Sequence, residues 1–210
     1  MNKAILLALP GLMAAGGCGP RAMTLSENPV DRAATCGVVA AAQSRHVSKD
    51  VKSALPIEAQ GKILHYAALA GAETEEFSQD KATDVTKRMA AMADEVTDSD
   101  WQKLVEPCEK AFPMPAKATL PEDPLVAGLG CDAMRQFVSA ALAADGRYAD
   151  TLAGYSELER KLDDKLGPLL ARRGFDSNKE DQVQKRKAMS VVSKAGTPTQ
   201  ILEACVARYT

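Results

Sequence analysis

The cysteines are the residues of this chain most suited to chemistry, because thiols can pair, bind metals or be acylated. There are five, Cys18, Cys36, Cys108, Cys131 and Cys205. No CxxC pair occurs and the chain has only two histidines, so the ligand spacing of zinc and redox motifs is missing. We therefore expect structural disulfides from the four cysteines after Cys18, with no metal and no other cofactor.

Those four cysteines belong to a sequence that occurs twice. Residues 24–36 match residues 119–131, with Thr, Leu, Glu, Asn or Asp, Pro, Val or Leu, and Cys at corresponding positions. Residues 105–112 and 202–209 form a second matching pair, each with Glu two positions before Cys. The sequence therefore predicts a tandem duplication of two units.

The duplication bears on how the cysteines pair. Four cysteines allow three sets of pairs, and sequence alone does not decide among them. A unit that was stable before duplication would carry its own bond, which favours Cys36 with Cys108 and Cys131 with Cys205. The two spacings along the chain are nearly equal. Each bond would join the first helix of its unit to the last.

The remaining cysteine ends a segment that has the features of a secretory signal. Lys3 supplies the positive start, an apolar centre follows to Ala15, and Gly16 and Gly17 precede Cys18. The end of the segment resembles the lipobox of bacterial lipoprotein precursors, in which the signal is cut before a cysteine that is then acylated. This resemblance implies a lipid on Cys18 that anchors the protein in the bacterial envelope, facing the periplasm. A soluble periplasmic or secreted protein is the alternative.

Composition favours helices. Apolar residues make up 46% of the chain and aromatic residues only 4%, so the cores are filled mainly by Ala, Leu, Val and Met. No alternating pattern long enough for a typical strand occurs. We therefore expect an all-α fold, a tandem duplication of two small disulfide-closed helical bundles with about four helices each.

Capping residues predict where the helices begin. Asn28 and Asp123 each precede a proline at the first helical position, and Ser99 and Thr197 are each followed by Gln three residues later. The other expected helices run from about 57 to 77, 80 to 96, 148 to 173 and 177 to 194.

These features divide the chain into five segments. They are a signal peptide at 1–17, a tether at 18–27, a first helical repeat at 28–112, a Pro-rich linker at 113–122 and a second helical repeat at 123–210.

Two histidines and one serine are further candidates for chemistry. His46 lies near the end of the first expected helix and His65 inside the second, so both belong to the first unit. Because the second unit has none, we expect structural or solvated roles for both. Ser156 lies in a partial nucleophile-elbow motif whose second glycine is replaced by Leu158. The sequence thus predicts no enzyme.

Charged residues gather in short runs, which we expect at helix ends and on solvated helix faces. Acidic residues within 73–76 and 94–100 flank expected helix ends, where we expect them to be solvated. We expect the basic run 185–187 to be a solvated helix face. Glu106 and Glu203, each two residues before a cysteine, are expected to form an ion pair inside their own unit.

Two functions remain open. The first is an interaction or accessory module that binds an unknown envelope protein; the alternative is a module for a small apolar ligand or lipid. A net charge of −2 gives no general attraction for nucleic acid. Trp101 would anchor a partner if exposed, although we expect it to pack. The Ala-rich first unit predicts a filled core, whereas Tyr148 and Tyr155 make the second unit the better candidate for a pocket.

Overall fold

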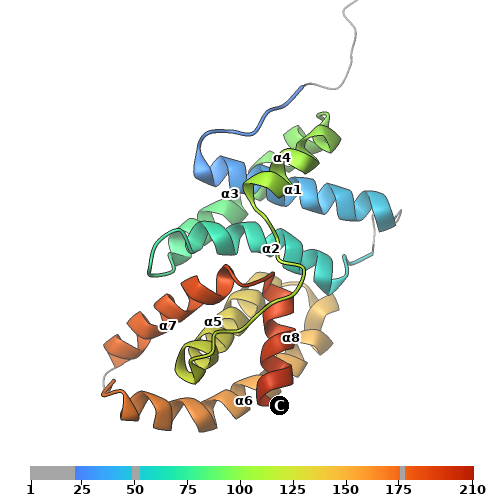
Figure 1. The fold of residues 1–210 in the computed structure, drawn as a ribbon. Helices are drawn as coiled ribbons and strands as arrows, with labels where there is room; N and C mark the ends of the chain where they lie inside the picture. The colour runs from blue at the N-terminus through green and yellow to red at the C-terminus, as the bar shows by residue number, and fades with distance from the viewer. Residues whose placement is uncertain (1–21, 49–52, 176–177) are drawn as a thin grey trace, which may run out of the picture.

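A computed structural model of the chain is shown in Figure 1, and it describes residues 22–48, 53–175 and 178–210. Throughout that part the chain is helical and forms no strand, so the all-α prediction is confirmed. The elements are α1 (Pro29–Ser48), α2 (Ile57–Gly71), α3 (Gln79–Thr97), η1 (Trp101–Leu104), α4 (Val105–Ala111), α5 (Pro124–Leu142), η2 (Gly146–Tyr148), α6 (Ala149–Arg172), α7 (Asn178–Ser193) and α8 (Pro198–Tyr209). We call α1–α4 the first half and α5–α8 the second half.

The predicted starts of α1 and α5 are confirmed. The Asn28 side chain accepts hydrogen bonds from the backbone N–H of Val30 at 2.9 Å and of Asp31 at 3.2 Å. The Asp123 side chain accepts in the same way from Leu125 at 2.9 Å and Val126 at 3.4 Å. These bonds satisfy amide groups that the first turn of a helix leaves without a partner.

Only one of the two predicted capping boxes exists. Thr197 and Gln200 form the box at the start of α8. Ser99 instead donates its hydroxyl to the Val96 carbonyl at 2.7 Å, and the chain continues through η1 into the seven-residue α4. Because α4 begins at Val105, Pro107 falls in its first turn, where a missing N–H costs nothing. The proline thus helps to explain why this helix starts late and stays short.

α2 ends at Gly71, six residues earlier than the pattern predicted. Phe77 is buried, and its backbone N–H donates to the Arg186 carbonyl at 3.1 Å. Its ring packs edge-on against Phe137, with 6.0 Å between the centroids. These contacts with the second half hold residues 73–77 in a loop, so tertiary packing overrides local helix propensity here.

Two disulfides cross-link the chain, so the prediction of disulfide bonds is confirmed. Cys36 of α1 pairs with Cys108 of α4, with a Cα–Cα distance of 5.4 Å and a sequence separation of 72. Cys131 of α5 pairs with Cys205 of α8, with a distance of 5.8 Å and a separation of 74. These are the pairs that the near-equal spacings favour, and each ties the first helix of its half to the last.

The two halves share one continuous hydrophobic core, in which α2 is central (Figure 1). α2 packs against α1 and α3 on one side and against α8 on the other. Gly61 allows the close approach of α2 to α8, because a Cβ at this position would lie 2.1 Å from the Thr199 Oγ1. The junction between the halves is therefore tightly packed at this glycine.

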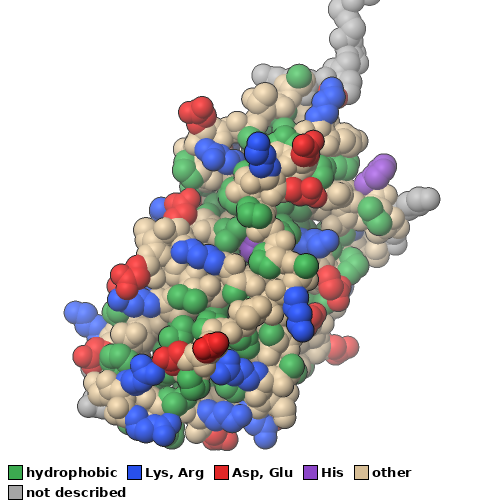
Figure 2. All heavy atoms as spheres, viewed as in Figure 1, with side chains coloured by type: hydrophobic (Ala, Val, Ile, Leu, Met, Phe, Trp, Pro, Cys, Tyr) green, Lys and Arg blue, Asp and Glu red, His purple; other side chains and the backbone are tan. Residues whose placement is uncertain are grey.

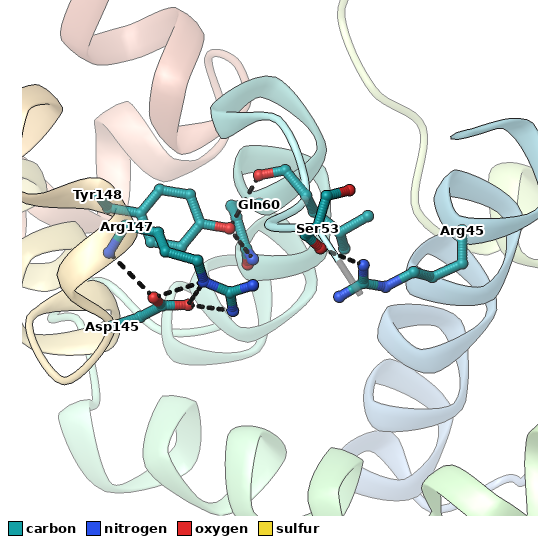
Figure 3. A network of polar contacts seen from close by, with 7 residues as sticks. Arg45, Ser53, Gln60, Asp145, Arg147 and Tyr148 are labelled. Atoms are coloured by element: carbon teal, nitrogen blue, oxygen red, sulfur yellow. Dashed lines mark hydrogen bonds and ion pairs between the residues drawn. The ribbon is translucent and has the colours of Figure 1, made fainter. Parts of the chain in front are cut away.

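Polar contacts reinforce this junction (Figure 3). The Tyr148 hydroxyl of the second half donates to the Leu55 carbonyl at 2.8 Å and accepts from the Gln60 amide at 2.7 Å. Arg45, at the end of α1, donates to the Ser53 carbonyl at 2.6 Å and so holds the chain that leads into α2. The position of α2 is thus fixed by hydrogen bonds from both halves.

Candidate functional site

The four paired cysteines cannot themselves form a reactive site. Cys36, Cys108, Cys131 and Cys205 are each at most 2% exposed. A buried disulfide offers neither a thiolate nor access for a partner thiol, so these bonds are structural. Cys18 and the signal segment 1–17 lie outside the described residues.

The two histidines lie in different environments. His46 is exposed, and its ring lies edge-on to that of Trp101 with 6.1 Å between centroids. His65 is completely buried in α2, and this burial lowers its pKa to about 4. Its ring nitrogens make no hydrogen bond of standard geometry to a described residue. The nearby backbone of Gly196 raises the pKa of His65 and so offsets part of the lowering caused by burial. Among the described residues, neither histidine belongs to a group of side chains that could hold a metal ion.

The acidic residues at 73–76 are not simply solvated, because they pair with basic residues. Glu75 accepts a hydrogen bond from Lys187 at 2.7 Å, and Glu76 accepts from Arg186 at 2.7 Å. The Lys187 ammonium lowers the pKa of the Glu75 carboxyl. The two acids of the loop after α2 thus pair with α7, so the basic run is partly exposed to solvent as expected but is also engaged in ion pairs.

The other candidate residues do not form a catalytic set. Ser156 is exposed on α6, inside a regular helix rather than at a sharp turn. The expected ion pairs of Glu106 and Glu203 are not found, since both side chains are exposed and no described residue pairs with them. Within the described part of the chain, no group of three or more His, Cys, Asp and Glu side chains could hold a metal ion.

The best candidate for a site is an apolar groove on the first half, which we call the α1–α3 groove. It has a volume of about 640 Å³ and opens to solvent between α1 and α3. Gly37 of α1 lies against the Met89 side chain at its floor, where a Cβ would come within 2.0 Å of the Met89 Cε. The walls carry short side chains: Ala41, Ala42, Ala90 and Ala93.

Small residues explain why this groove exists. α1 and α3 pack closely at Gly37, so larger side chains farther along would fill the space between them. Alanines on both helices leave it empty instead. At one end the groove is closed by Trp101, which is half-buried and packs against the core, as we expected for this residue. Arg45 and His46 lie at the same end.

The lining of the α1–α3 groove is mainly apolar and suited to binding an apolar surface. Among the described residues that line it, none is Asp, Glu, Cys or Ser. Threonine and alanine dominate on α3, and an aromatic ring lies at the end. Binding of a partner to such a surface is favourable because it removes apolar area of both molecules from water.

Tyr148 and Tyr155, which made the second half the better candidate for a pocket, are not among the described residues that line the α1–α3 groove. Tyr148 is buried and its hydroxyl is used in the junction. The leucine stripe of α6 is also buried, with Leu158, Leu162 and Leu166 at most 7% exposed. Burial raises the pKa of the Tyr155 phenol, as expected for a packed ring. Large side chains thus fill the α6 side of this half, while a depression of about 350 Å³ remains between α5 and α7.

The face shown in Figure 2 carries Lys and Arg side chains interspersed with Asp and Glu. None of the described helices is long and apolar enough to cross a membrane. Compared with known protein-family models, curated proteins and solved structures, the chain matches none. The site must therefore be interpreted from its own geometry.

Proposed function

We propose that this protein is a non-enzymatic envelope lipoprotein that binds another envelope protein through the α1–α3 groove. The open, apolar shape of the groove carries this proposal. An open groove of Ala and Thr lets the backbone of a partner helix approach closely, and helix-in-groove binding is a common mode of peptide recognition. The half-buried Trp101 at its end is the type of residue that anchors such interfaces.

The anchor and location in this proposal rest on the N-terminal sequence. The lipobox-like end of the signal implies an acylated Cys18, and residues 18–27 would then tether the helical body to the membrane. Two disulfides fit an oxidising compartment such as the periplasm. The membrane contact is thus through the lipid, and the groove stays available for a protein.

A tandem duplication is also part of the proposal. It is supported by the matching N-caps Asn28 and Asp123, each followed by proline. It is further supported by two disulfides that join corresponding helices over separations of 72 and 74 residues. In both halves the first helix closely approaches the third at a glycine beside the cysteine, Gly37 in one and Gly130 in the other.

The proposal is tested by photo-cross-linking in intact cells. A photoreactive amino acid is placed at Ala90, which lines the groove, or at Ala91, which is exposed on the same helix but outside the lining. We expect one envelope protein to be captured from position 90 and not from position 91. Equal capture from both positions, or none from position 90, would contradict a protein-binding groove.

A small apolar ligand or lipid is the second candidate occupant. The groove volume of about 640 Å³ lies within the range of ligand pockets, about 300 to 1,000 Å³. Mass spectrometry of solvent extracts from the natively purified protein tests this candidate. A single co-purifying lipid that is lost on Ala90→Glu substitution, with no captured protein, would favour it over the adaptor.

A further inference from the structure

The α1–α3 groove does not end at the first half, because two further depressions continue it. The first has a volume of about 440 Å³ and lies between α2, α3 and α5. It shares Ile63, Thr86 and Met89 with the α1–α3 groove. The second has a volume of about 350 Å³ and lies between α3, α5 and α7. It shares Gln79, Phe137 and Ala140 with the middle depression.

One helix runs beside all three depressions, so they form a single trough across both halves. α3 contributes one stripe of mainly short side chains to the trough: Gln79, Thr83, Thr86, Ala90, Ala93 and Thr97. These positions recur at three- and four-residue spacing, which places them on one face of the helix. From Gln79 to Thr97 the trough is about 27 Å long at the helical rise of about 1.5 Å per residue.

Among the described residues that line the trough, the basic side chains lie at its two ends. Arg45 and His46 lie at the end near Trp101, and Lys185 and Arg186 lie at the opposite end. Among the described lining residues, the middle depression has no charged one and the three depressions have no acidic one. The described lining is therefore apolar along its middle and carries basic side chains at both ends.

The basic groups at the far end already have partners. Lys185 pairs with Asp132, and Arg186 pairs with Glu76 at 2.7 Å. Both of these acids lie outside the lining of the trough. The Arg186–Glu76 pair is more than 40% exposed on each side, so an acidic group of a partner can compete for Arg186 at low cost. The ion pairs thus hold the basic groups in place without placing an acid in the trough.

We propose that the trough binds an amphipathic helix of about 18 residues, which at the helical rise spans its length, with a small-residue apolar face and acidic residues at both ends. This inference rests on the proposed function, for which it names the chemistry of the partner. Short side chains along α3 permit close approach of the partner backbone. The basic ends favour an acidic helix over a basic one through charge complementarity.

The test uses synthetic helical peptides as probes of the purified, disulfide-bonded protein. Two 18-residue peptides share an Ala/Leu face and differ only in carrying Glu or Lys at both ends. Affinity is measured from the anisotropy of a labelled peptide, and location from the fluorescence of Trp101, the only tryptophan of the chain. We expect the Glu-ended peptide to bind at least about tenfold tighter, to perturb Trp101 and to weaken as salt rises.

Ala90 and Ala91 provide matched variants for this test. Both are exposed on α3, both would gain one negative charge as Glu, and each has an acid four residues later, Asp94 or Glu95. We expect Ala90→Glu to weaken the Glu-ended peptide at least about tenfold and Ala91→Glu to change its affinity less than about twofold. Circular dichroism confirms that both variants keep the helical fold.

The remaining outcomes separate this inference from the proposed function. Equal affinity of the two peptides, or no binding of either, overturns the acidic-ended helix as occupant. If oleate perturbs Trp101 and neither peptide does, the occupant is a lipid and the inference also fails. The proposed function survives these results when cross-linking at Ala90 in cells still captures one protein, and it fails separately when it does not.

Discussion

The first and second halves share one arrangement, a disulfide and a close helix contact at a glycine, which we call the frame. They differ in how much space they leave open between their helices. In both, a disulfide joins the first helix to the last, and a glycine beside the cysteine of the first helix allows the third helix to approach closely. In the first half a Cβ at Gly37 would meet Met89, and in the second a Cβ at Gly130 would meet Val192. The frame alone therefore does not create the groove.

The difference lies in the side chains outside this frame. In the second half, Leu158, Leu162 and Leu166 form a buried stripe on α6 and fill the space beside α5. Between the first and third helices, the second half has a depression of about 350 Å³, whereas the first half has the groove of about 640 Å³, lined on α1 and α3 mainly by alanine and threonine. The comparison teaches that side-chain volume between the first and third helices, and not the cross-link, decides how large a groove each half leaves open.

The halves also differ in their last helices. α4 has seven residues and contains Pro107, whereas α8 has twelve, has Ala204 at the corresponding position and buries Ile201 and Leu202 in the core. α8 packs against α2 of the first half as well as against α5 and α6. The longer helix therefore joins the two halves, while the shorter one only closes its own half.

Removing one disulfide at a time tests whether the two frames are equivalent, and it has the largest expected effect. Cys36→Ala with Cys108→Ala, and Cys131→Ala with Cys205→Ala, each open a loop of similar length. The chain-entropy model gives a loss of about 4 kcal/mol in unfolding free energy for each pair. Guanidinium denaturation measures both losses. A large loss for one pair and almost none for the other would show that the frames are not equivalent.

The buried histidine, present only in the first half, predicts acid sensitivity that the second half lacks. Burial disfavours the charged ring and lowers the pKa of His65 from its ordinary value of 6.5 to about 4 in the folded protein. As pH falls from about 6.5 to about 4, the unfolded chain gains a proton that the folded chain does not. Unfolding free energy therefore falls over this window by roughly 3 kcal/mol, and the loss levels off below it.

Two histidine variants isolate this effect from the carboxylates that titrate in the same range. His65→Leu keeps an apolar side chain in the core and removes the ionisable ring, so its unfolding free energy changes less between pH 7 and pH 4 than that of the parent protein. His46→Leu is the control, because His46 is exposed. Urea denaturation at both pH values measures the difference. If the unfolding free energy of His65→Leu fell between pH 7 and pH 4 as much as that of the parent protein, the role assigned to His65 would be contradicted.

The close approach of α2 to α8 predicts a smaller effect at the junction of the halves. Gly61→Ala places a methyl group against Thr199, and overpacking of this kind costs about 1 to 3 kcal/mol. Gly154→Ala is the control, since no atom lies within 4 Å of a Cβ there, and it is expected to stabilise α6 by up to about 1 kcal/mol. Thermal unfolding followed by circular dichroism compares the melting temperatures of the two variants. Equal changes in melting temperature would argue against a tight junction at Gly61.

Local signals in the sequence were sufficient for much of this fold. The caps at Asn28, Asp123 and Thr197 were predicted, because the amides they satisfy lie within three residues. The expected helix from about 148 to 173 ends close to where α6 ends, at Arg172, and Gly174 follows with a positive φ of 73°. The pairs of cysteines were favoured by an argument about repeats rather than by local chemistry.

Features that depend on contacts between the halves were not predicted. Phe77 leaves the helical pattern of α2 to pack on Phe137, sixty residues away. The basic run on α7 looked solvated because its partners, Glu75 and Glu76, lie in another half. The groove was also missed, although the alternation of Ala and Thr at helical spacing on α3 was a visible signal. The small residues of the first unit predict a filled core. The way in which α1 packs on α3, which leaves alanines and threonines of α3 open to solvent, does not follow from the sequence.

The two matching N-caps allow the smallest difference between the halves to be measured. Asn28→Ala and Asp123→Ala each remove a side-chain acceptor, so each is expected to cost about 1 kcal/mol of unfolding free energy.

Asp123 also pairs with Arg173 at 2.8 Å, and the Arg173 guanidinium lowers the pKa of this carboxyl. Asp123→Asn keeps the cap and removes the charge. Because the ion pair is well exposed, this variant is expected to cost much less than Asp123→Ala. The stabilisation by the charge is present above the ordinary pKa of 3.8 and is lost as pH falls through the lower folded value. Denaturation at pH 7 measures all three, and a loss in Asp123→Asn as large as in Asp123→Ala would show that the charge, and not the cap, distinguishes the second half.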